Sequence, residues 1–564
     1  ANDPHLGLSN PSVWYPIHLD SVTRGTGTLN VAGVSFPGLP AVVIGHNEHL
    51  AWGFTTTYFD MTDVYVETLS PDGAGVMHDG QVVPFVEKDF TFGVSMGQPV
   101  TRTFQYVPHH GPVLSIDRDA GIAITVRWST QDASTDANYL LGMARATSVA
   151  EARAALRGLT TIGQNVVVAD RAGSIGWFPY NQVPSRPWAS AQAPNWLPLD
   201  GEGGQEWGGY VDYDDLPQAV DPAAGFIATA NNDMTGAFWD GDPTNEGQAA
   251  LQTDAAAGYR HERIVQGITA RDDHTRDTMN TLLADVHSLV GERMTPPLLM
   301  AVDGAPGLDA AGAKVRDALA AWDFECPSGL DGVDLDTATP VDGDAATASI
   351  GCAAFHVLLP RLVDAAMADE LAGSELIARP FLVSFINLVL RPDALQLGAD
   401  WWDDVATDEV EGMPAIVAAA MNDAGAYLET TLGDDPDTWR WGRLHTVTLR
   451  ANLFDDAGIP DFNNGPYVND GGWFTVDVAN PSGMYRDDYT QRSGPSMRFA
   501  CDLRAETPVA CTLQVPGGNV LFRDDPHYDD QLKKWLVNEP FDLHFTADAV
   551  LSHTERIVRF EVVP

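Results

Sequence analysis

Cysteine and positive charge are both scarce in this sequence of 564 residues. It has 4 cysteines, and its 32 lysines and arginines stand against 78 aspartates and glutamates, which gives a formal net charge of −46. So acidic a protein repels the phosphates of nucleic acids and of anionic membranes, and neither is an expected partner. Apolar residues make up 44%, which is ordinary for a globular protein and too many for a disordered one.

Long apolar runs are missing as well. The nearest candidate, Phe381–Leu390, is interrupted by Ser384 and Asn387 and is too short to cross a bilayer. We interpret it as a buried helix and expect no membrane span. The chain opens with Ala1 and shows neither an initiator methionine nor a signal peptide, so we expect a processed product or a fragment.

The common short catalytic and metal-binding signatures are absent too. There is no GxSxG elbow, Walker loop, HExxH, or GxGxxG with a suitably placed acid, and no Cys/His cluster has zinc spacing. The pair His109 and His110 lies at a strand end and need not bind metal. The cysteines form two pairs along the sequence, Cys326 with Cys352 and Cys501 with Cys511. Four buried thiols and two local disulfides fit this spacing equally well, and the disulfides would require an oxidising compartment.

Hydrophobic periodicity divides the chain into three regions. Residues 1–260 have the alternation typical of strands, as in Ile122–Trp128, with one helix that begins at a capping box of Ser148 and Glu151. Residues 261–439 are predicted to be mostly helical, including a stripe over 279–290 that stops at Gly291. Strand patterns return over residues 440–564. We expect a large core built from both ends of the chain, with a helical region inserted between them.

Four longer segments carry more information, and they occur in one order along the chain. They are Ala1-Asn2-Asp3-Pro4-His5-Leu6-Gly7; Phe36-Pro37-Gly38-Leu39-Pro40 with Ile44-Gly45-His46-Asn47 and Ala51-Trp52-Gly53; Asn165–Asp170 with Ile175-Gly176-Trp177; and Gly225–Asn232. Together they resemble the penicillin acylase family of N-terminal nucleophile hydrolases. The resemblance extends over essentially the whole chain. It implies an α+β fold of four layers, αββα, in which two packed sheets lie between helices, with a helical insertion.

The resemblance also implies how the chemistry is done. Enzymes of this family are made as one precursor, which cuts itself to expose a serine whose hydroxyl attacks an amide carbonyl. The α-amine of such a serine titrates at about 7.7–8.0, so it can accept the hydroxyl proton. That serine lies a short stretch before the Asn-Asp-Pro-His segment, and Ala1 has no hydroxyl. We therefore expect the nucleophile and the smaller α subunit to lie outside this chain, and the 564 residues alone to be inactive.

Four catalytic positions follow from the resemblance. His5 matches a position that holds His or Gln in the family and would orient the nucleophile. Asn231 matches an amide that donates to the oxyanion, and Thr56 matches a second donor that acts through its backbone N–H. Arg260 matches an arginine near the site. From composition alone, His5 is an ordinary histidine near a terminus, Asn231 a turn residue and Arg260 a surface arginine.

A structural Ca²⁺ is also implied, and no organic cofactor. Asp60, Asp63 and Asp242, with the carbonyl of Thr62, match the calcium-binding positions of the family, and hard oxygen ligands suit this ion. In a chain with 78 acids, solvated surface carboxylates are the alternative interpretation.

The acyl-binding pocket is partly predicted. Leu6 and Ile44 fall where relatives that prefer phenylacetyl groups carry aromatic rings, and aliphatic walls suit an alkyl chain at least as well. The expected substrate is therefore a small N-acyl molecule such as a β-lactam, an acylated lipopeptide or an acyl-homoserine lactone. The expected partner is the α subunit from the same precursor, and the expected location is periplasmic or secreted.

Two other functional classes remain open. A catalytically inactive homologue would keep the fold for binding or scaffolding, and the sequence upstream of Ala1 distinguishes it from an enzyme. A secreted glycan-binding or glycosidase-like β protein would explain the tryptophan content and the acidity, but not the four collinear segments.

Overall fold

A computed structural model describes residues 1–132, 134, 136–190, 192–236, 251–252, 255–369, 371, 382–391, 399–481 and 487–560. The largest sheet has seven antiparallel strands in the order β16-β14-β13-β5-β4-β3-β2. Their bounds are Ala219–Val220 (β16), Ile175–Tyr180 (β14), Gln164–Asp170 (β13), Leu50–Thr56 (β5), Ile44–His46 (β4), Asn30–Ser35 (β3) and Tyr15–Asp20 (β2).

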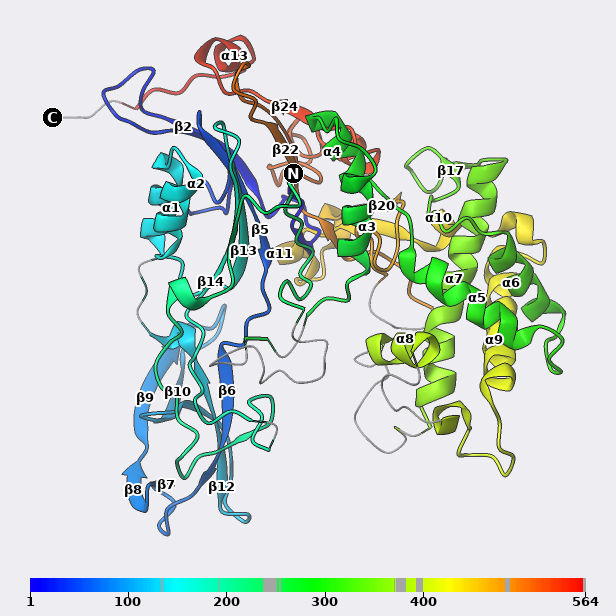
Figure 1. Cartoon of the computed structure of the whole chain (residues 1–564), viewed down its shortest axis with the longest axis horizontal. Helices are drawn as coiled ribbons and strands as arrows, with labels where there is room; N and C mark the ends of the chain where they lie inside the picture. The colour runs from blue at the N-terminus through cyan, green and yellow to red at the C-terminus, as the bar shows by residue number, and fades with distance from the viewer. Residues whose placement is uncertain are drawn as a thin grey trace.

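Two helices, α1 (Ala137–Arg145) and α2 (Val149–Leu156), cover one face of this sheet (Figure 1). The start of α2 has one of the two hydrogen bonds of the predicted capping box. The Ser148 side chain accepts from the Glu151 N–H, but the Glu151 carboxylate accepts from the N–H and hydroxyl of Thr147 instead of reaching Ser148. Leu156 on α2 is fully buried against the sheet.

A second, smaller sheet packs on the other face. It consists of β22 (Arg498–Asp502), β23 (Ala510–Gln514) and β24 (Phe541–Leu543). Phe499 and Leu513 share one buried cluster with Phe54 of the seven-stranded sheet. On the opposite face, α4 (Arg276–Leu283) packs on β22, and Asn280 Nδ2 donates to Thr512 Oγ1 over 3.1 Å. The order of helices, sheet, sheet and helix is the expected αββα arrangement.

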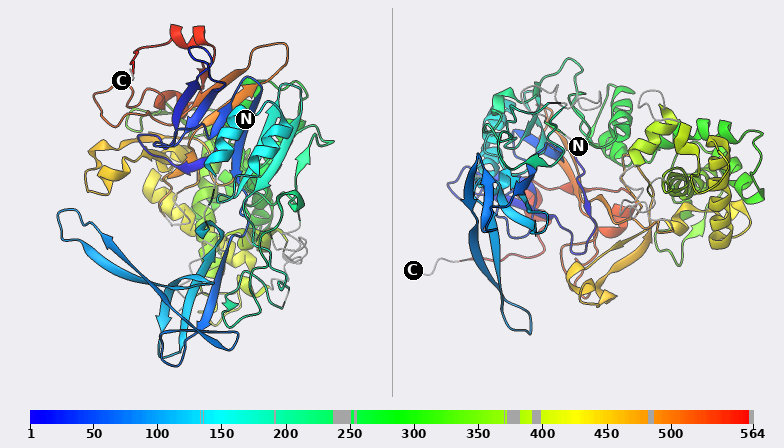
Figure 2. Two further views of the ribbon diagram at one scale, coloured as in Figure 1. Left: turned by 90° about the vertical axis from the view of Figure 1, so that its left-hand side faces the viewer. Right: turned by 90° about the horizontal axis from the view of Figure 1, so that it is seen from below.

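A third sheet extends away from these layers (Figures 1 and 2). Its six strands, in the order β15-β6-β12-β11-β10-β9, include a long hairpin, and a further pair, β7-β8, lies beside it. Alternation predicted Ile122–Trp128 with the bounds that β12 has. The bounds are Thr62–Thr68 (β6), Gly75–His78 (β7), Gln81–Pro84 (β8), Val86–Phe92 (β9), Val100–Val107 (β10), Gly111–Asp117 (β11), Ile122–Trp128 (β12) and Leu199–Asp200 (β15).

A helical region forms the opposite side of the molecule (Figure 1). It contains α5 (Leu289–Val302), α6 (Ala310–Ala321), α7 (Asp344–Met367), α8 (Leu382–Leu390) and α9 (Met413–Leu432), with the short strands β17 (Leu330–Asp331) and β18 (Thr339–Pro340). The helix α3 (Tyr259–Thr269) lies with α4 between this region and the sheets (Figure 1). The expected buried helix corresponds to α8, with Phe385 and Ile386 buried; Phe381 lies outside the described residues.

The prediction of one helical stripe that stops at Gly291 is wrong. The stripe belongs to two helices, because α4 ends at Leu283 and α5 begins at Leu289, with Gly291 inside α5. A Cβ on Gly291 would lie 2.4 Å from the ring of Trp322. The glycine therefore serves close packing between elements, not helix termination.

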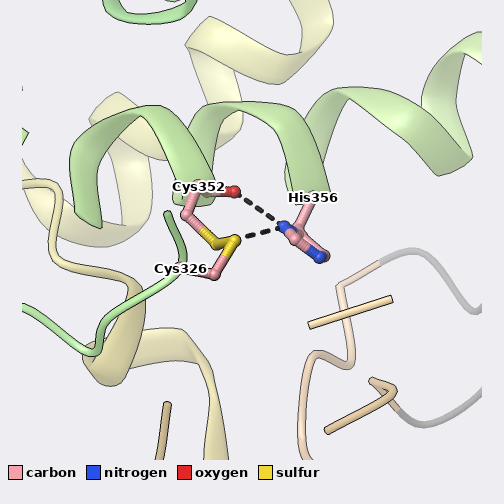
Figure 3. Close-up of side chains that lie close together, drawn as sticks. All are labelled: Cys326, Cys352 and His356. Carbon is pink, nitrogen blue, oxygen red and sulfur yellow. Dashed lines mark hydrogen bonds between the residues drawn. A yellow bond between two sulfur atoms is a disulfide. The ribbon is translucent and has the colours of Figure 1, made fainter. Parts of the chain in front are cut away.

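Among the described residues, one helix, α7, is long and apolar enough to cross a membrane by length and composition. Of its most apolar window, 89% is buried inside the protein, so it is the core helix of the helical region. Cys352 of α7 forms a disulfide with Cys326 (Figure 3), and a second disulfide joins Cys501 of β22 to Cys511 of β23. The structure thus has the two local disulfides that the sequence left open.

The remaining strands and α-helices are short. They are β19 (Thr446–Leu449) paired with β20 (Asn464–Val468), the short strands β1 (His5–Gly7) and β21 (Ser493–Pro495), and the helices α10 (Trp441–Leu444), α11 (Asn452–Asp455), α12 (Leu532–Leu536) and α13 (Ala547–Ser552).

Candidate active site

The first residues of the chain are fixed between the two packed sheets. The backbone of Asn2 exchanges hydrogen bonds with Phe499 of β22 (2.8 and 2.9 Å), and β1 pairs antiparallel with β21. The side chain of Asn2 pairs with the other sheet: it accepts from the Phe54 N–H and donates to the Phe54 carbonyl, both over 3.0 Å. Asn2 thus behaves as one more backbone partner for β5, at the residues beyond its pairing with β4.

This anchoring places His5 beside two charged groups. His5 Nε2 lies 3.2 Å from Asp3 Oδ2, and its Nδ1 lies 3.5 Å from Arg260 Nη1. Arg260 is near the start of α3, and burial lowers the pKa of its guanidinium. A guanidinium begins from so high a pKa that it stays charged.

Asn231 is held by the same arginine. Its Oδ1 accepts from Arg260 Nη2 over 2.9 Å, and the same Nη2 donates to the Ala230 carbonyl over 2.9 Å. Asn231 Nδ2 donates to the Thr56 carbonyl over 3.1 Å. Its backbone has φ of +61°, a left-handed conformation that asparagine tolerates better than most residues. The amide is therefore oriented at both ends, and the described residues supply an acceptor for only one of its two N–H groups.

The four predicted catalytic residues thus lie in one hydrogen-bonded chain, from His5 through Arg260 and Asn231 to Thr56. They come from β1, the start of α3, the segment after β16 and the end of β5. Sequence reasoning missed Asp3, although it belongs to the same Asn-Asp-Pro-His segment as His5.

Sequence reasoning also missed a second support for Thr56. Asn165 of β13 donates from Nδ2 to the Thr56 carbonyl (3.3 Å) and to Thr55 Oγ1 (3.2 Å). Its Oδ1 in turn accepts from Trp177 Nε1 over 2.9 Å. Asn165 and Trp177 both occur in the third segment of the family resemblance, which was the available signal.

A cavity of about 200 Å³ adjoins the first residues of the chain. Its walls are mostly apolar, and Ala1 forms part of them. The lining also includes Trp52, Phe54, Ile227, Ile264, Ile268, Met279, Leu282 and Phe499. Neither Leu6 nor Ile44 is in this lining: Leu6 is 38% exposed on β1, and Ile44 is 1% exposed inside the sheet. Their role in acyl binding stays a prediction.

Two of the predicted calcium ligands, Asp60 and Asp63, contact the same arginine. Arg186 is buried, and its Nε lies 2.9 Å from Asp63 Oδ2 while its Nη2 lies 3.3 Å from Asp60 Oδ2. Burial raises the pKa of Asp60, an effect that Arg186 opposes. The Thr62 N–H is 3.3 Å from Asp60 Oδ1. Asp242 lies outside the described residues.

These residues nevertheless fit a hard cation. Asp63 Oδ1 and Asn195 Oδ1 are buried, and neither has a hydrogen-bond partner within the described part of the chain. Asn195 belongs to the same group, since its Nδ2 donates to Asp60 Oδ2 over 2.6 Å. Buried oxygens without donors are costly unless they bind a cation, and such oxygens are the ligands of Ca²⁺. Arg186 cancels only one of the two carboxylate charges.

Comparison with known proteins identifies the family. Residues 1–552 match the family described as Penicillin amidase. The chain belongs to this family. Within it, the chain is 28% identical over 589 residues to the acyl-homoserine lactone acylase QuiP of Pseudomonas aeruginosa, covering 96% of this chain and 64% of that protein. It is 31% identical over 410 residues to the penicillin acylase 2 proenzyme of Pseudomonas sp. (strain SE83), and this alignment covers 71% of this chain and 46% of that protein.

The fold has a solved counterpart among the penicillin amidases. A thermostable penicillin G acylase from Alcaligenes faecalis superposes with a TM-score of 0.71 at 19% identity, over 100% of this chain and 96% of that one. At this identity the similarity concerns the fold, which confirms the expected N-terminal nucleophile hydrolase architecture. The chain spans 64% and 46% of the lengths of the two relatives above.

Proposed function

We propose that the protein hydrolyses the amide bond of small N-acyl molecules, the activity class of linear amidases (EC 3.5.1.-). The observation that carries this proposal is the hydrogen-bonded chain from His5 through Arg260 and Asn231 to Thr56. It supplies an oriented amide donor held by a buried cation, which suits the stabilisation of an oxyanion. Acylases among the relatives support the same reaction class.

In this proposal the nucleophile is an N-terminal serine that these 564 residues do not contain. Its hydroxyl oxygen forms a bond to the acyl carbonyl carbon while its α-amine takes the hydroxyl proton. Asn231 Nδ2–H and the Thr56 N–H donate to the resulting oxyanion. The C–N bond then breaks, the amine leaves with a proton, and water hydrolyses the acyl ester. His5 orients the serine, and Arg260 positions both His5 and the Asn231 amide.

The substrate class follows from the walls near this site. The apolar cavity beside Ala1 suits an acyl chain, so we propose a β-lactam, an acylated lipopeptide or an acyl-homoserine lactone as substrate. The α subunit from the same precursor would complete the enzyme. Two disulfides favour a periplasmic or secreted location, since such bonds persist in oxidising compartments.

We also propose that Asp60, Asp63, Asp242 and the Thr62 carbonyl hold a structural Ca²⁺. The ion would supply positive charge to buried oxygens that lack donors, and so link the start of β6 to the loop that carries Arg186. Asp63→Asn removes one charge at similar size. It is expected to abolish the rise in unfolding midpoint that Ca²⁺ gives after EGTA treatment, measured by calorimetry. An equal rise in both proteins would contradict this assignment.

The experiment that tests the function uses the protein produced from its complete gene. Amine release is measured over a panel from phenylacetyl to long alkyl amides, and mass spectrometry identifies the N-terminal residue of the mature large subunit. We expect hydrolysis, an N-terminal serine, and no activity from the 564-residue chain alone. Activity of that chain would overturn the nucleophile proposal. A processed protein that cleaves no amide in the panel would support an inactive binding or scaffold homologue instead.

A further inference from the structure

Histidines and glutamates gather on the six-stranded sheet. Glu67 lies on β6, His109 and His110 lie in the turn between β10 and β11, and His78 ends β7. One ligand atom each from Glu67, His109 and His110 lies within 4.8 Å of the other two. The ring of His78 packs on that of His109, with centroids 4.0 Å apart. The sequence interpretation of His109 and His110 as structural did not foresee this cluster.

Two buried atoms of the cluster are left without a hydrogen bond. They are Glu67 Oε2 and His109 Nε2, neither of which has a partner among the residues that the structure describes. The other oxygen of Glu67, Oε1, accepts from the Thr125 hydroxyl over 2.6 Å and lies 2.7 Å from His110 Nδ1. Glu67 and His110 are both fully buried. A buried carboxylate oxygen and a buried ring nitrogen that lack partners are costly unless a further group binds between them.

The chemistry of these atoms points to a metal. A neutral histidine ring carries a lone pair that ligates metals, and His109 Nε2 is a buried ring nitrogen with no hydrogen-bond partner among the described residues. His110 Nε2 lies 2.9 Å from Glu206 Oε1. A carboxylate in this position commonly orients an imidazole whose other nitrogen binds a metal.

We infer that Glu67, His109 and His110 form a binding site for a zinc-type transition-metal ion. Two imidazoles and one carboxylate are ligands that Zn²⁺ prefers. A tetrahedral ion with bonds of about 2.0–2.2 Å holds its ligand atoms about 3.3–3.6 Å apart. The 2.7 Å contact between Glu67 Oε1 and His110 Nδ1 therefore has to lengthen, while the other separations, none above 4.8 Å, need only a small closure. His110 then binds through Nδ1 in place of its contact with Glu67, and Nε2–H donates to Glu206.

A second compact cluster shows why unpartnered atoms matter. Cys326, Cys352 and His356 are equally close together (Figure 3). Both sulfurs are in a disulfide, His356 Nδ1 donates to the Cys352 carbonyl, and Nε2 accepts from the Trp473 N–H. Every ligand atom of that cluster is already engaged, and it carries no metal proposal.

The test is a Zn²⁺ titration of the mature, untagged protein after removal of metals with EDTA. Isothermal titration with a competing chelator is expected to show one site per molecule. His109→Phe and Glu67→Gln are each expected to weaken binding by about 100-fold, and Glu206→Gln by about tenfold because it acts through His110. Co²⁺ is expected to give the strong visible absorption of a tetrahedral site. Anomalous scattering at the zinc edge then locates the ion.

The matched control is His287→Asn. His287 also lies between two glutamates, with Nδ1 2.8 Å from Glu325 and Nε2 3.0 Å from Glu292, but within the described ranges it belongs to no cluster of possible metal ligands. Its substitution is expected to leave the Zn²⁺ affinity unchanged. Unfolding midpoints of all variants, measured without metal, identify any variant that fails to fold. If His109→Phe fails to fold, the Zn²⁺ affinity of Glu67→Gln, which keeps the shape of the side chain, decides whether the site exists. Absence of stoichiometric binding, equal affinity in all variants, or an anomalous peak elsewhere would overturn the inference.

Discussion

Asn231 is the residue whose substitution tests the proposed active site most directly. Its Oδ1 is held by Arg260 and its Nδ2 by the Thr56 carbonyl, which leaves one N–H for an oxyanion. Loss of one oxyanion donor reduces kcat by about 10²–10³, or about 2.7–4 kcal/mol of transition-state stabilisation. We expect Asn231→Ala to show a loss of this size. KM should change much less, because the acyl chain is proposed to bind the apolar cavity.

The backbone at this position requires a second variant. Because φ at Asn231 is +61°, alanine there adds about 1–2 kcal/mol of conformational strain, whereas glycine adopts this region freely. Asn231→Gly therefore removes the amide without that strain. We expect the same loss of kcat in both variants and a higher unfolding temperature for the glycine variant.

The assay measures amine release by the mature enzyme, with kcat and KM separated, beside thermal unfolding of each protein. A kcat of Asn231→Gly within threefold of the wild type would refute the oxyanion role. A loss confined to Asn231→Ala would show that backbone strain, not the missing donor, had disturbed the site.

Other predictions concern stability. The two disulfides close loops with sequence separations of 26 and 10 residues. Loop entropy predicts that the free energy of unfolding falls by about 3.5 kcal/mol without Cys326–Cys352 and by about 2.7 kcal/mol without Cys501–Cys511. Urea unfolding of serine variants measures both losses, and equal losses would argue against the loop-entropy explanation. Burial lowers the pKa of His445 from 6.5 to about 4, so between these values the unfolded chain binds a proton that the folded protein does not. The contribution of His445 to stability is then fully present above pH 6.5 and is lost as pH falls toward 4. His445→Gln should make the pH dependence of the unfolding free energy less steep, while buried His46 and His356, whose pKa values burial also lowers, keep part of it.

Local patterns predicted elements better than they predicted contacts between elements. Alternation found β12 at its actual bounds, since its side chains face two different environments. The same kind of reasoning merged α4 with α5, because apolar spacing continues across the gap between two helices. Gly291 was taken for a stop signal when its function is to admit the ring of Trp322, which lies 31 positions later in sequence.

In the candidate site, too, local segments could be predicted from sequence, whereas contacts between distant residues could not. His5 and Asn231 stand in segments whose order along the chain resembles the family, so they could be proposed from sequence. Arg186 could not, since its contact with Asp63 joins residues 123 positions apart and no local pattern marks it. The cluster of Glu67 with His109 and His110 likewise depends on the pairing of β6 with β12, and of β12 with β11, which brings the residues together.

Asn2 links the two sheets at the point where the proposed nucleophile must be held. Its amide satisfies both backbone groups of Phe54. It can come this close because Gly53 has no side chain; a Cβ at Gly53 would lie 2.7 Å from the Asn2 side chain. Asn2→Ala leaves two backbone groups of Phe54 unpaired, at about 1–3 kcal/mol each where water is excluded. Gly53→Ala should cause a similar loss by displacing Asn2 while keeping its amide.

Both variants are therefore expected to lower the unfolding midpoint and to reduce kcat, because a nucleophile a short stretch upstream would lose its anchor. The measurement is kcat per mature active site, counted by N-terminal sequencing, beside thermal unfolding. Asn2→Asp is the matched control: its carboxylate can still accept from the Phe54 N–H but cannot donate to the carbonyl, so an intermediate effect is expected. If all three variants kept full kcat, the positioning of the nucleophile would have to depend on other contacts, such as the pairing of β1 with β21.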